Sequence, residues 1–156
     1  MALLSIVKYP DPRLEEPTKS VECFDDELRA LAEDMIETMH AAPGIGLAAP
    51  QVARSERVTV VDLSAGAEAD ELLVLVNPVV VAESGSVSED EGCLSFPDLT
   101  LVVPRPERVV GEAQDLDGEP FSIEAEELLA RCVHHEIDHL DGVLFLRRVS
   151  PLKRDL

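Results

Sequence analysis

The stretch His135-Glu136-Ile137-Asp138-His139 places two imidazoles four residues apart with a carboxylate between them. On a helix, residues i and i+4 share one face, so the two histidines can bind one metal ion while Glu136 lies beside it. The stretch therefore predicts a helix with a metal site on one face, and together with the cysteine motif described next it indicates a hydrolytic site.

Two histidines still need a third ligand, and an upstream motif supplies a candidate. Glu91-Gly92-Cys93-Leu94-Ser95 contains a cysteine with small and polar neighbours, which can offer a thiolate. The other cysteines, Cys23 and Cys132, form no paired spacing with it, which argues against a disulfide framework and for a reducing compartment. We expect Cys23 and Cys132 to be small buried residues.

A third motif, Gly44-Ile45-Gly46-Leu47-Ala48-Ala49-Pro50-Gln51, combines two glycines with a neutral amide. Glycines let backbone approach a ligand closely, and Gln51 can donate a hydrogen bond where a carboxylate would repel developing negative charge. The glycine motif and the histidine motif also have simpler interpretations. The glycine motif can be a tight turn with close helix packing, and His135 and His139 can be core or capping histidines.

Composition limits the possible partners. The chain has 156 residues and 17.0 kDa, the size of one domain, so we expect residues 1–156 to form a single catalytic domain. Asp and Glu number 32 against 13 Lys and Arg, and the net charge of −19 disfavours nucleic acid and anionic membranes as direct ligands. There is no apolar run of about 18 residues and no signal-peptide pattern at the start, so we expect a cytoplasmic location.

Hydrophobic periodicity predicts two helices and several strands. The first helix spans Asp25 to about Ala42, and the second begins near Glu124 and ends at Gly142. The Asn77-Pro78 pair is expected to interrupt the strands. Predicted strands are Val58–Leu63, Leu72–Val76, Val79–Val81, Leu101–Val103, Arg108–Gln114 and Pro120–Ile123. This order predicts an α+β fold in which a mainly antiparallel sheet packs around the metal-binding helix.

The three motifs together, in their order and spacing, resemble the peptide deformylase family. The resemblance covers nearly the whole chain. It includes Pro10-Asp11-Pro12-Arg13-Leu14, Val76-Asn77-Pro78, Leu144-Phe145 and Ser150-Pro151-Leu152. It implies a hydrolase that removes the N-formyl group from the formyl-methionine of nascent bacterial or organellar peptides and releases formate.

The resemblance also implies roles for individual residues. Cys93, His135 and His139 would hold one metal ion and leave a coordination position open. Ferrous iron is the implied ion, with zinc or nickel plausible in purified protein. Glu136 would act as general base, while the Gln51 side chain and the Leu94 backbone N–H would stabilise negative charge on the formyl oxygen.

Further residues would bind the N-formylmethionyl peptide. Backbone at Ile45, Gly46 and Gly92 would pair with the extended peptide like a neighbouring strand. Leu128, Cys132 and His135 would line the pocket for the methionine side chain.

This chain departs from the family pattern at several positions. Glu89 and Arg131 stand where apolar pocket residues are usual. They either pair across the pocket rim and alter the preference for methionine, or extend into solvent. His134 replaces a glutamine, and Thr100 replaces an arginine, while Arg105 keeps the second basic position.

The sequence alone leaves two other functions possible, and it also allows the ribosome as a partner. The chain can be a metallopeptidase-like hydrolase of another amide, or a noncatalytic metal-binding paralogue, although a binding module needs neither Glu136 nor Gln51.

The sequence lacks the long C-terminal helix by which some relatives are thought to dock on ribosomes. A basic cluster remains near its end, at Arg147, Arg148, Lys153 and Arg154. It allows a transient ribosome contact.

Overall fold

The computed structural model describes residues 3–149, which form an α+β fold. The predicted Ser150-Pro151-Leu152 motif, Lys153 and Arg154 lie outside these described residues. The helices are α1 (Asp26–Ala41) and α2 (Glu127–Leu140). The strands are β1 (Gly46–Ala48), β2 (Val58–Asp62), β3 (Leu72–Ser84), β4 (Val87–Cys93), β5 (Phe96–Arg105), β6 (Arg108–Gln114) and β7 (Pro120–Glu126). Short 3-10 turns are η1 (Pro12–Glu15), η2 (Ala49–Val52), η3 (Ala69–Glu71) and η4 (Phe145–Arg148).

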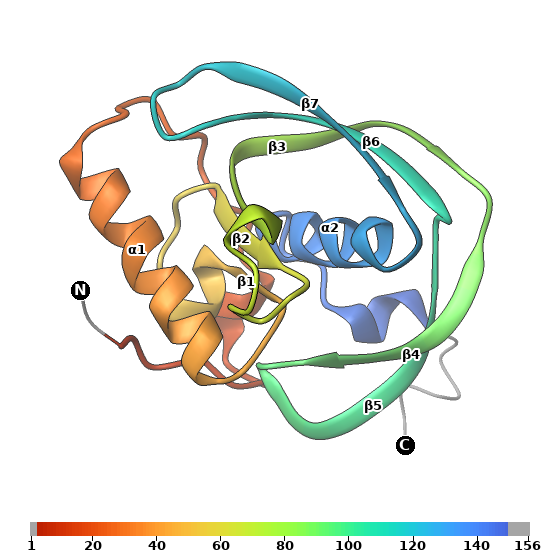
Figure 1. The fold of residues 1–156 in the computed structure, drawn as a ribbon. Helices are drawn as coiled ribbons and strands as arrows, with labels where there is room; N and C mark the ends of the chain where they lie inside the picture. The colour runs from red at the N-terminus through yellow and green to blue at the C-terminus, as the bar shows by residue number, and fades with distance from the viewer. Residues whose placement is uncertain (1–2, 150–156) are drawn as a thin grey trace.

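Helix α2 lies at the centre of the molecule, with strands on several sides (Figure 1). Strands β1-β2-β3-β6-β7 form an antiparallel sheet in that order, and α2 packs against all five of them. Strands β4 and β5 form a separate antiparallel pair. The predicted α+β class and the central position of the metal-binding helix are confirmed. Among the described residues, no helix is long and apolar enough to cross a membrane.

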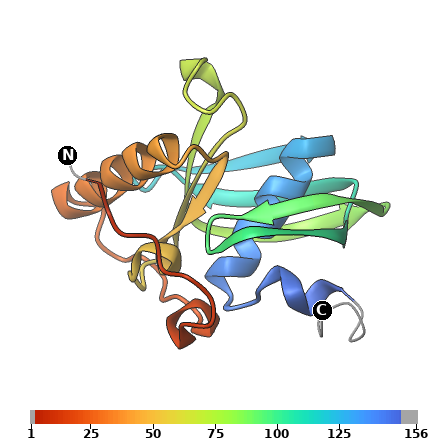
Figure 2. The same cartoon turned by 90° about the horizontal axis from the view of Figure 1, so that it is seen from below.

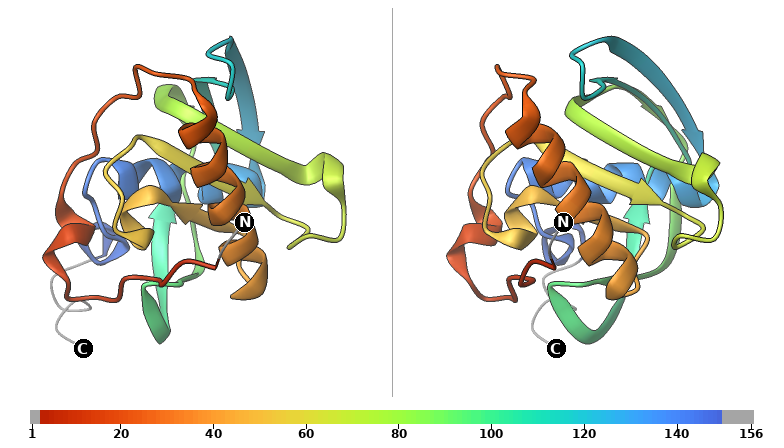
Figure 3. Two further views of the ribbon diagram at one scale, coloured as in Figure 1. Left: turned by 90° about the vertical axis from the view of Figure 1, so that its left-hand side faces the viewer. Right: turned by 60° about the vertical axis from the view of Figure 1, so that its left-hand side comes forward.

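Helix α1 forms where the periodicity predicted it. The Asp25 side chain caps its start by accepting a hydrogen bond from the Leu28 backbone N–H at 3.1 Å. Its apolar face, including Leu31, Met35 and Met39, is buried in the main core cluster with residues of β1, β2 and β3. Figure 3 shows α1 crossing in front of these strands. This packing fixes the loop that follows α1 and leads into β1.

The predicted interruption at Asn77-Pro78 is wrong, because β3 continues through it to Ser84. Asn77 adopts φ +53°, and the pairing with β6 shifts register between Val76 and Val79. The Asn77 side chain bonds to both backbone groups of Val21, at 2.7 and 3.0 Å. Pro78 has no backbone N–H to donate to the sheet. A β-bulge at this point accommodates the missing donor, so the strand does not end there.

Several other elements differ from the prediction, among them β5, which is longer than the predicted Leu101–Val103, and the unpredicted β1. Helix α2 begins at Glu127 instead of near Glu124, because β7 continues to pair with β6 as far as the partners Arg108 and Glu126. Strand β4 was not predicted, since its sequence Val87–Cys93 is largely polar and lacks apolar alternation. Cys23 is exposed, contrary to the expectation that it is buried, while Cys132 is buried as expected.

The segment after α2 turns back under the fold and packs on β5 (Figure 2). Leu144 and Phe145 are buried in a second core cluster with Leu14 and Phe96. The turn at Gly142 has φ +77°, the left-handed conformation expected at a helix end. This packing holds η4 close to the C-terminal half of α2.

Candidate metal centre and active site

Three predicted ligands converge at one point. His135 and His139 lie on one face of α2, and Cys93 lies at the end of β4. The Cys93 Sγ is 3.2 Å from His139 Nε2, which is 3.1 Å from His135 Nε2. All three ligand atoms lie within 4.8 Å of one another. Adjacent ligands of an ion with bonds of about 2.0–2.3 Å lie roughly 3–4 Å apart, so these residues fit a metal ion with a Cys-His-His set.

His135 is held by a carboxylate on the side of its ring opposite the other ligands. Its Nδ1 forms a hydrogen bond to Glu91 Oε1, which leaves Nε2 directed toward Cys93 and His139. Burial alone would raise the pKa of Glu91, but its hydrogen bonds with His135 and Arg105 outweigh burial and hold that pKa at about 2. An ionised carboxylate on Nδ1 fixes the tautomer and orientation of a metal-binding histidine.

Arg105 links this carboxylate to a second one. Its side chain is fully buried, and it donates from Nε and Nη2 to Glu91 at 3.1 and 2.6 Å. From Nη1 it donates to Asp138 at 2.6 Å and to Nδ1 of His134 at 2.9 Å. The sequence identified Arg105 only as a basic position shared with the family pattern; the structure shows a buried ion-pair network behind the metal site. Asp138, inside the helix motif, also belongs to this network.

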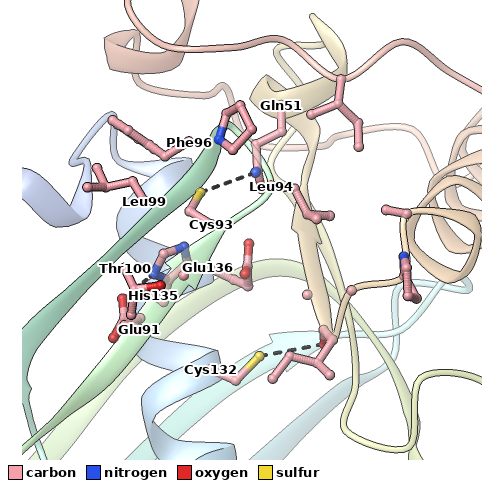
Figure 4. Close-up of a pocket in the computed structure, with 18 of the residues that line it drawn as sticks. Gln51, Glu91, Cys93, Leu94, Phe96, Leu99, Thr100, Cys132, His135 and Glu136 are labelled. Atoms are coloured by element: carbon pink, nitrogen blue, oxygen red, sulfur yellow. Dashed lines mark hydrogen bonds and ion pairs between the residues drawn. The ribbon is translucent and has the colours of Figure 1, made fainter.

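Glu136 stands beside the ligands with a free carboxylate oxygen. The residue is 4% exposed, and Oε1 has no hydrogen-bond partner among the described residues. Burial raises the pKa of Glu136 to about 7. A Cβ at Gly46 would lie 2.5 Å from Glu136 Oε2, so only glycine lets β1 approach this carboxylate. Figure 4 shows Glu136 pointing into the cavity between Cys93 and Cys132.

Gln51 is fixed on the opposite side of the site. The backbone N–H of Ala48 donates to Gln51 Oε1 at 3.0 Å, which orients the amide. The Nε2 group then lies 3.6 Å from Cys93 Sγ and 3.2 Å from Ser95 Oγ. Leu94, whose backbone N–H is the second predicted donor, follows Cys93 directly and lines the same cavity. Ser95, which the sequence analysis gave no role, is fully buried beside Gln51.

A cavity of about 740 Å³ opens beside these groups, between α2, the β4–β5 pair and the loop before β1. Its lining includes Gln51, Cys93, His135 and Glu136. The predicted substrate residues found in the lining are Ile45, Gly46, Gly92, Leu128, Arg131 and Cys132. Leu128 is 42% exposed, so it lies at the mouth of the cavity.

Glu89 is the one predicted substrate residue that the structure does not bring into the cavity lining. Its side chain is exposed on β4. Among residues 3–149, no ion pair joins Glu89 to Arg131, so the structure does not show the first of the two alternatives, pairing across the rim. The family resemblance placed Glu89 at the pocket, but its exposed side chain on β4 lies outside the cavity lining.

Comparisons with known proteins agree with this geometry. The sequence model of the polypeptide deformylase family matches residues 3–155. A peptide deformylase of Acidobacterium capsulatum is 55% identical over all of this chain and 92% of its own length. The crystal structure of a peptide deformylase from Legionella pneumophila superposes with a TM-score of 0.93 at 45% identity, covering 98% of this chain and 89% of that one. One from Thermus thermophilus superposes with a TM-score of 0.93 at 43% identity, covering 99% of this chain and 90% of that one.

The match extends over the described helices and strands, and over the motifs that carry the three metal ligands and Glu136. The resemblance read from the sequence is confirmed. The chain therefore belongs to the peptide deformylase family and is a hydrolytic enzyme of that family.

Proposed function

We propose that this enzyme hydrolyses the N-formyl group of formyl-methionyl peptides, with residues 1–156 acting as one catalytic domain. The observation that carries the proposal is the unpaired Glu136 carboxylate, which faces the same cavity as the Cys93, His135 and His139 ligand atoms. A ligand set, a buried acid or base and an open cavity are the parts that metal-assisted hydrolysis needs.

Different residues of the chain carry out different steps of the hydrolysis. When bound at Cys93, His135 and His139, a divalent ion supplies Lewis-acid activation of water and of the formyl carbonyl. Glu136 accepts a proton from the water that attacks the formyl carbon, and returns it to the amine nitrogen as the C–N bond breaks. Formate and a peptide with a free amino group result. Gln51 Nε2 and the Leu94 backbone N–H donate hydrogen bonds to the formyl oxygen as it becomes negative.

The cavity supports binding of an extended peptide. Ile45, Gly46 and Gly92 offer backbone on opposite sides of the cavity, and strand-like pairing there would be independent of peptide sequence. Cys132 and Leu128 offer apolar surface to the first side chain. Gly92 has room around it, since the nearest atom to an added Cβ is a backbone oxygen 4.0 Å away.

The remaining proposals concern the identity of the metal ion, the place of action in the cell and contact with the ribosome. A thiolate with two imidazoles suits iron, zinc or nickel, and we propose ferrous iron in the cell. Formyl-methionyl peptides emerge from ribosomes, so the proposed place of action is the cytoplasm. Transient ribosome contact stays a prediction; of the basic residues on which it rests, only Arg147 and Arg148 lie in the described part of the chain.

Substrate profiling tests this proposal against hydrolysis of another amide. Metal-loaded protein is incubated with formyl-Met-Ala-Ser, acetyl-Met-Ala-Ser and unblocked Met-Ala-Ser, and formate, acetate and free amino acids are quantified. We expect formate from the first peptide and no product from the others. Cleavage within the unblocked peptide, or release of acetate at a similar rate, would assign the site to a different amide hydrolase.

Arg131 is expected to shape the preference for the first side chain. It lines the cavity, and its side chain takes part in none of the ion pairs or hydrogen bonds found among residues 3–149. Its guanidinium is therefore available to an acidic substrate side chain. We expect Arg131→Leu to raise the ratio of kcat/KM for formyl-Met-Ala-Ser over formyl-Glu-Ala-Ser by roughly threefold to tenfold, the effect of a half-exposed charge pair. Glu89→Leu is the matched control and should leave the ratio unchanged. Equal ratios in wild type and Arg131→Leu would rule out this role for Arg131.

A further inference from the structure

A line of alternating charges runs from Arg148, whose side chain is 39% exposed, through the buried Asp138 and Arg105 side chains to the metal site. We propose that Arg148, the last residue of η4, is a positioning residue for the metal ligand His135, acting through Asp138, Arg105 and Glu91. This inference rests on the proposed metal site. It assigns a function in metal binding to the segment after α2, which contributes no ligand of its own.

The first link joins η4 to α2. Arg148 donates from Nε to Asp138 Oδ2 at 2.9 Å and from Nη2 to Asp138 Oδ1 at 2.7 Å. This two-pronged arrangement fixes the planes of both groups, which a single hydrogen bond does not. The Asp138 side chain is 8% exposed and lies on α2 between the metal ligands His135 and His139. The position of η4 is thereby tied to the helix that carries two of the three ligands.

The next links lead to the ligand itself. Asp138 Oδ2 also accepts a hydrogen bond from Arg105 Nη1 at 2.6 Å, and Arg105 uses Nε and Nη2 to hold Glu91. Glu91 in turn bonds to His135 Nδ1. Positive and negative groups therefore alternate from Arg148 to His135. By contrast, Nδ1 of His139 is buried without a partner in the described part of the chain, so this network orients only one of the two histidines.

Charge balance shows what Arg148 contributes. With Arg148 present, two carboxylates share two guanidiniums, and Arg105 can keep two of its donors on Glu91. Without Arg148, Arg105 is the one arginine that still pairs with the buried Asp138 among the described residues. A buried carboxylate that loses one cationic partner interacts more strongly with the partner that remains. Arg105 then shifts toward Asp138, the hold on Glu91 weakens, and the imidazole of His135 loses part of its fixed orientation.

The neighbouring Arg147 provides a control in the same turn. Arg147 is 58% exposed and pairs with Glu15 at 3.3 Å, on the surface and outside the network. It has the same charge, side-chain length and backbone element as Arg148. A general effect of removing a cation from η4 would therefore appear in both variants, whereas an effect on His135 would appear only at Arg148.

The test measures metal binding without any peptide. Zn²⁺ is titrated into metal-free wild type, Arg148→Met, Arg148→Lys and Arg147→Met in competition with a chromophoric chelator. The ¹H NMR signal of the His135 Nδ1 proton is recorded in the Zn²⁺-loaded forms. Loss of a direct partner of a metal-binding histidine typically costs 10–100-fold in metal affinity. Arg148 lies three groups beyond Glu91, the direct partner, so we expect about a threefold to tenfold higher Kd for Arg148→Met. Arg148→Lys, which keeps the charge, should recover part of the loss, and Arg147→Met should equal the wild type.

The NMR signal separates positioning from a general loss of stability. We expect the His135 Nδ1 proton to shift upfield in Arg148→Met, as its hydrogen bond to Glu91 weakens, and to stay in place in Arg147→Met. Equal Zn²⁺ affinity and an unshifted proton in Arg148→Met would overturn the inference while leaving the proposed function intact. Failure of the wild type to bind Zn²⁺ would overturn the metal site, and with it both proposals.

Discussion

Glu136→Ala should slow formate release by at least about a hundredfold while the protein keeps its metal. Cys93, His135 and His139 are untouched by this change, so the ligand set stays complete. The variant loses the only group at the site to which we assign proton transfer, a role that typically contributes 10²–10⁴-fold to a rate. We expect kcat/KM for formyl-Met-Ala-Ser to fall by about that factor. Metal content by elemental analysis and formate release are measured on the same samples.

The matched control is Glu89→Ala, which removes an exposed carboxylate from β4, outside the cavity lining. It should keep nearly full activity and full metal content. Since Glu136 Oε1 has no partner among the described residues, its removal should not lower the unfolding temperature. A Glu136→Ala enzyme that keeps its metal and releases formate at more than a tenth of the wild-type rate would show that another group carries the proton.

Of the substitutions proposed for this protein, Arg105→Leu should lower the free energy of unfolding the most. The Arg105 side chain is fully buried between Glu91 and Asp138, at 2.6 Å from each. Leucine would leave both carboxylates beside an apolar group, and removing one partner of a buried ion pair costs about 3–5 kcal/mol. We expect a fall of that size in the free energy of unfolding, measured by urea denaturation of the metal-free protein.

The control for Arg105→Leu is Arg108→Leu, on the neighbouring strand β6. Arg108 also faces two carboxylates, Glu124 and Glu126, at 3.1 and 3.6 Å, but its side chain is 42% exposed. Exposed pairs contribute about 0–1 kcal/mol, so this variant should lie close to the wild type. If the two substitutions destabilised the protein equally, burial of the network would not be what makes Arg105 important.

The sequence was most informative where chemistry and helical spacing coincide. Because i and i+4 share a helix face, the His135–His139 spacing predicted the metal-binding face of a helix before any fold was known. Cys93 could be named as third ligand from its neighbours. The periodicity and the Asp25 cap predicted α1 almost to the residue.

Strand boundaries were harder to predict, because pairing partners decide them. Nothing local in Val87–Cys93 predicts a strand; it becomes one by pairing with β5. Asn77-Pro78 reads as a break, yet a left-handed Asn77 and its bonds to Val21 convert it to a bulge. Beta structure depends on contacts distant in sequence, which single-residue preferences do not contain.

The supporting network was missed for a similar reason. Glu91, Arg105 and Arg148 come from three different elements, and in an acidic chain each looks like an ordinary surface charge. Charged residues are rarely fully buried unless they are paired. One signal was Asp138 inside the helix motif, since a carboxylate one residue before a buried metal ligand needs a cation nearby. Only the fold shows which arginines supply it.

The most direct test of the central claim is the metal dependence of formate release. Protein loaded anaerobically with Fe²⁺ is given formyl-Met-Ala-Ser; a second sample is stripped with a chelator, and a third is stripped and reloaded. We predict formate release by the first, none by the second and recovery by the third. Undiminished release by stripped protein, or no release by protein that holds one Fe²⁺ per chain, would contradict the proposed metal-dependent deformylation.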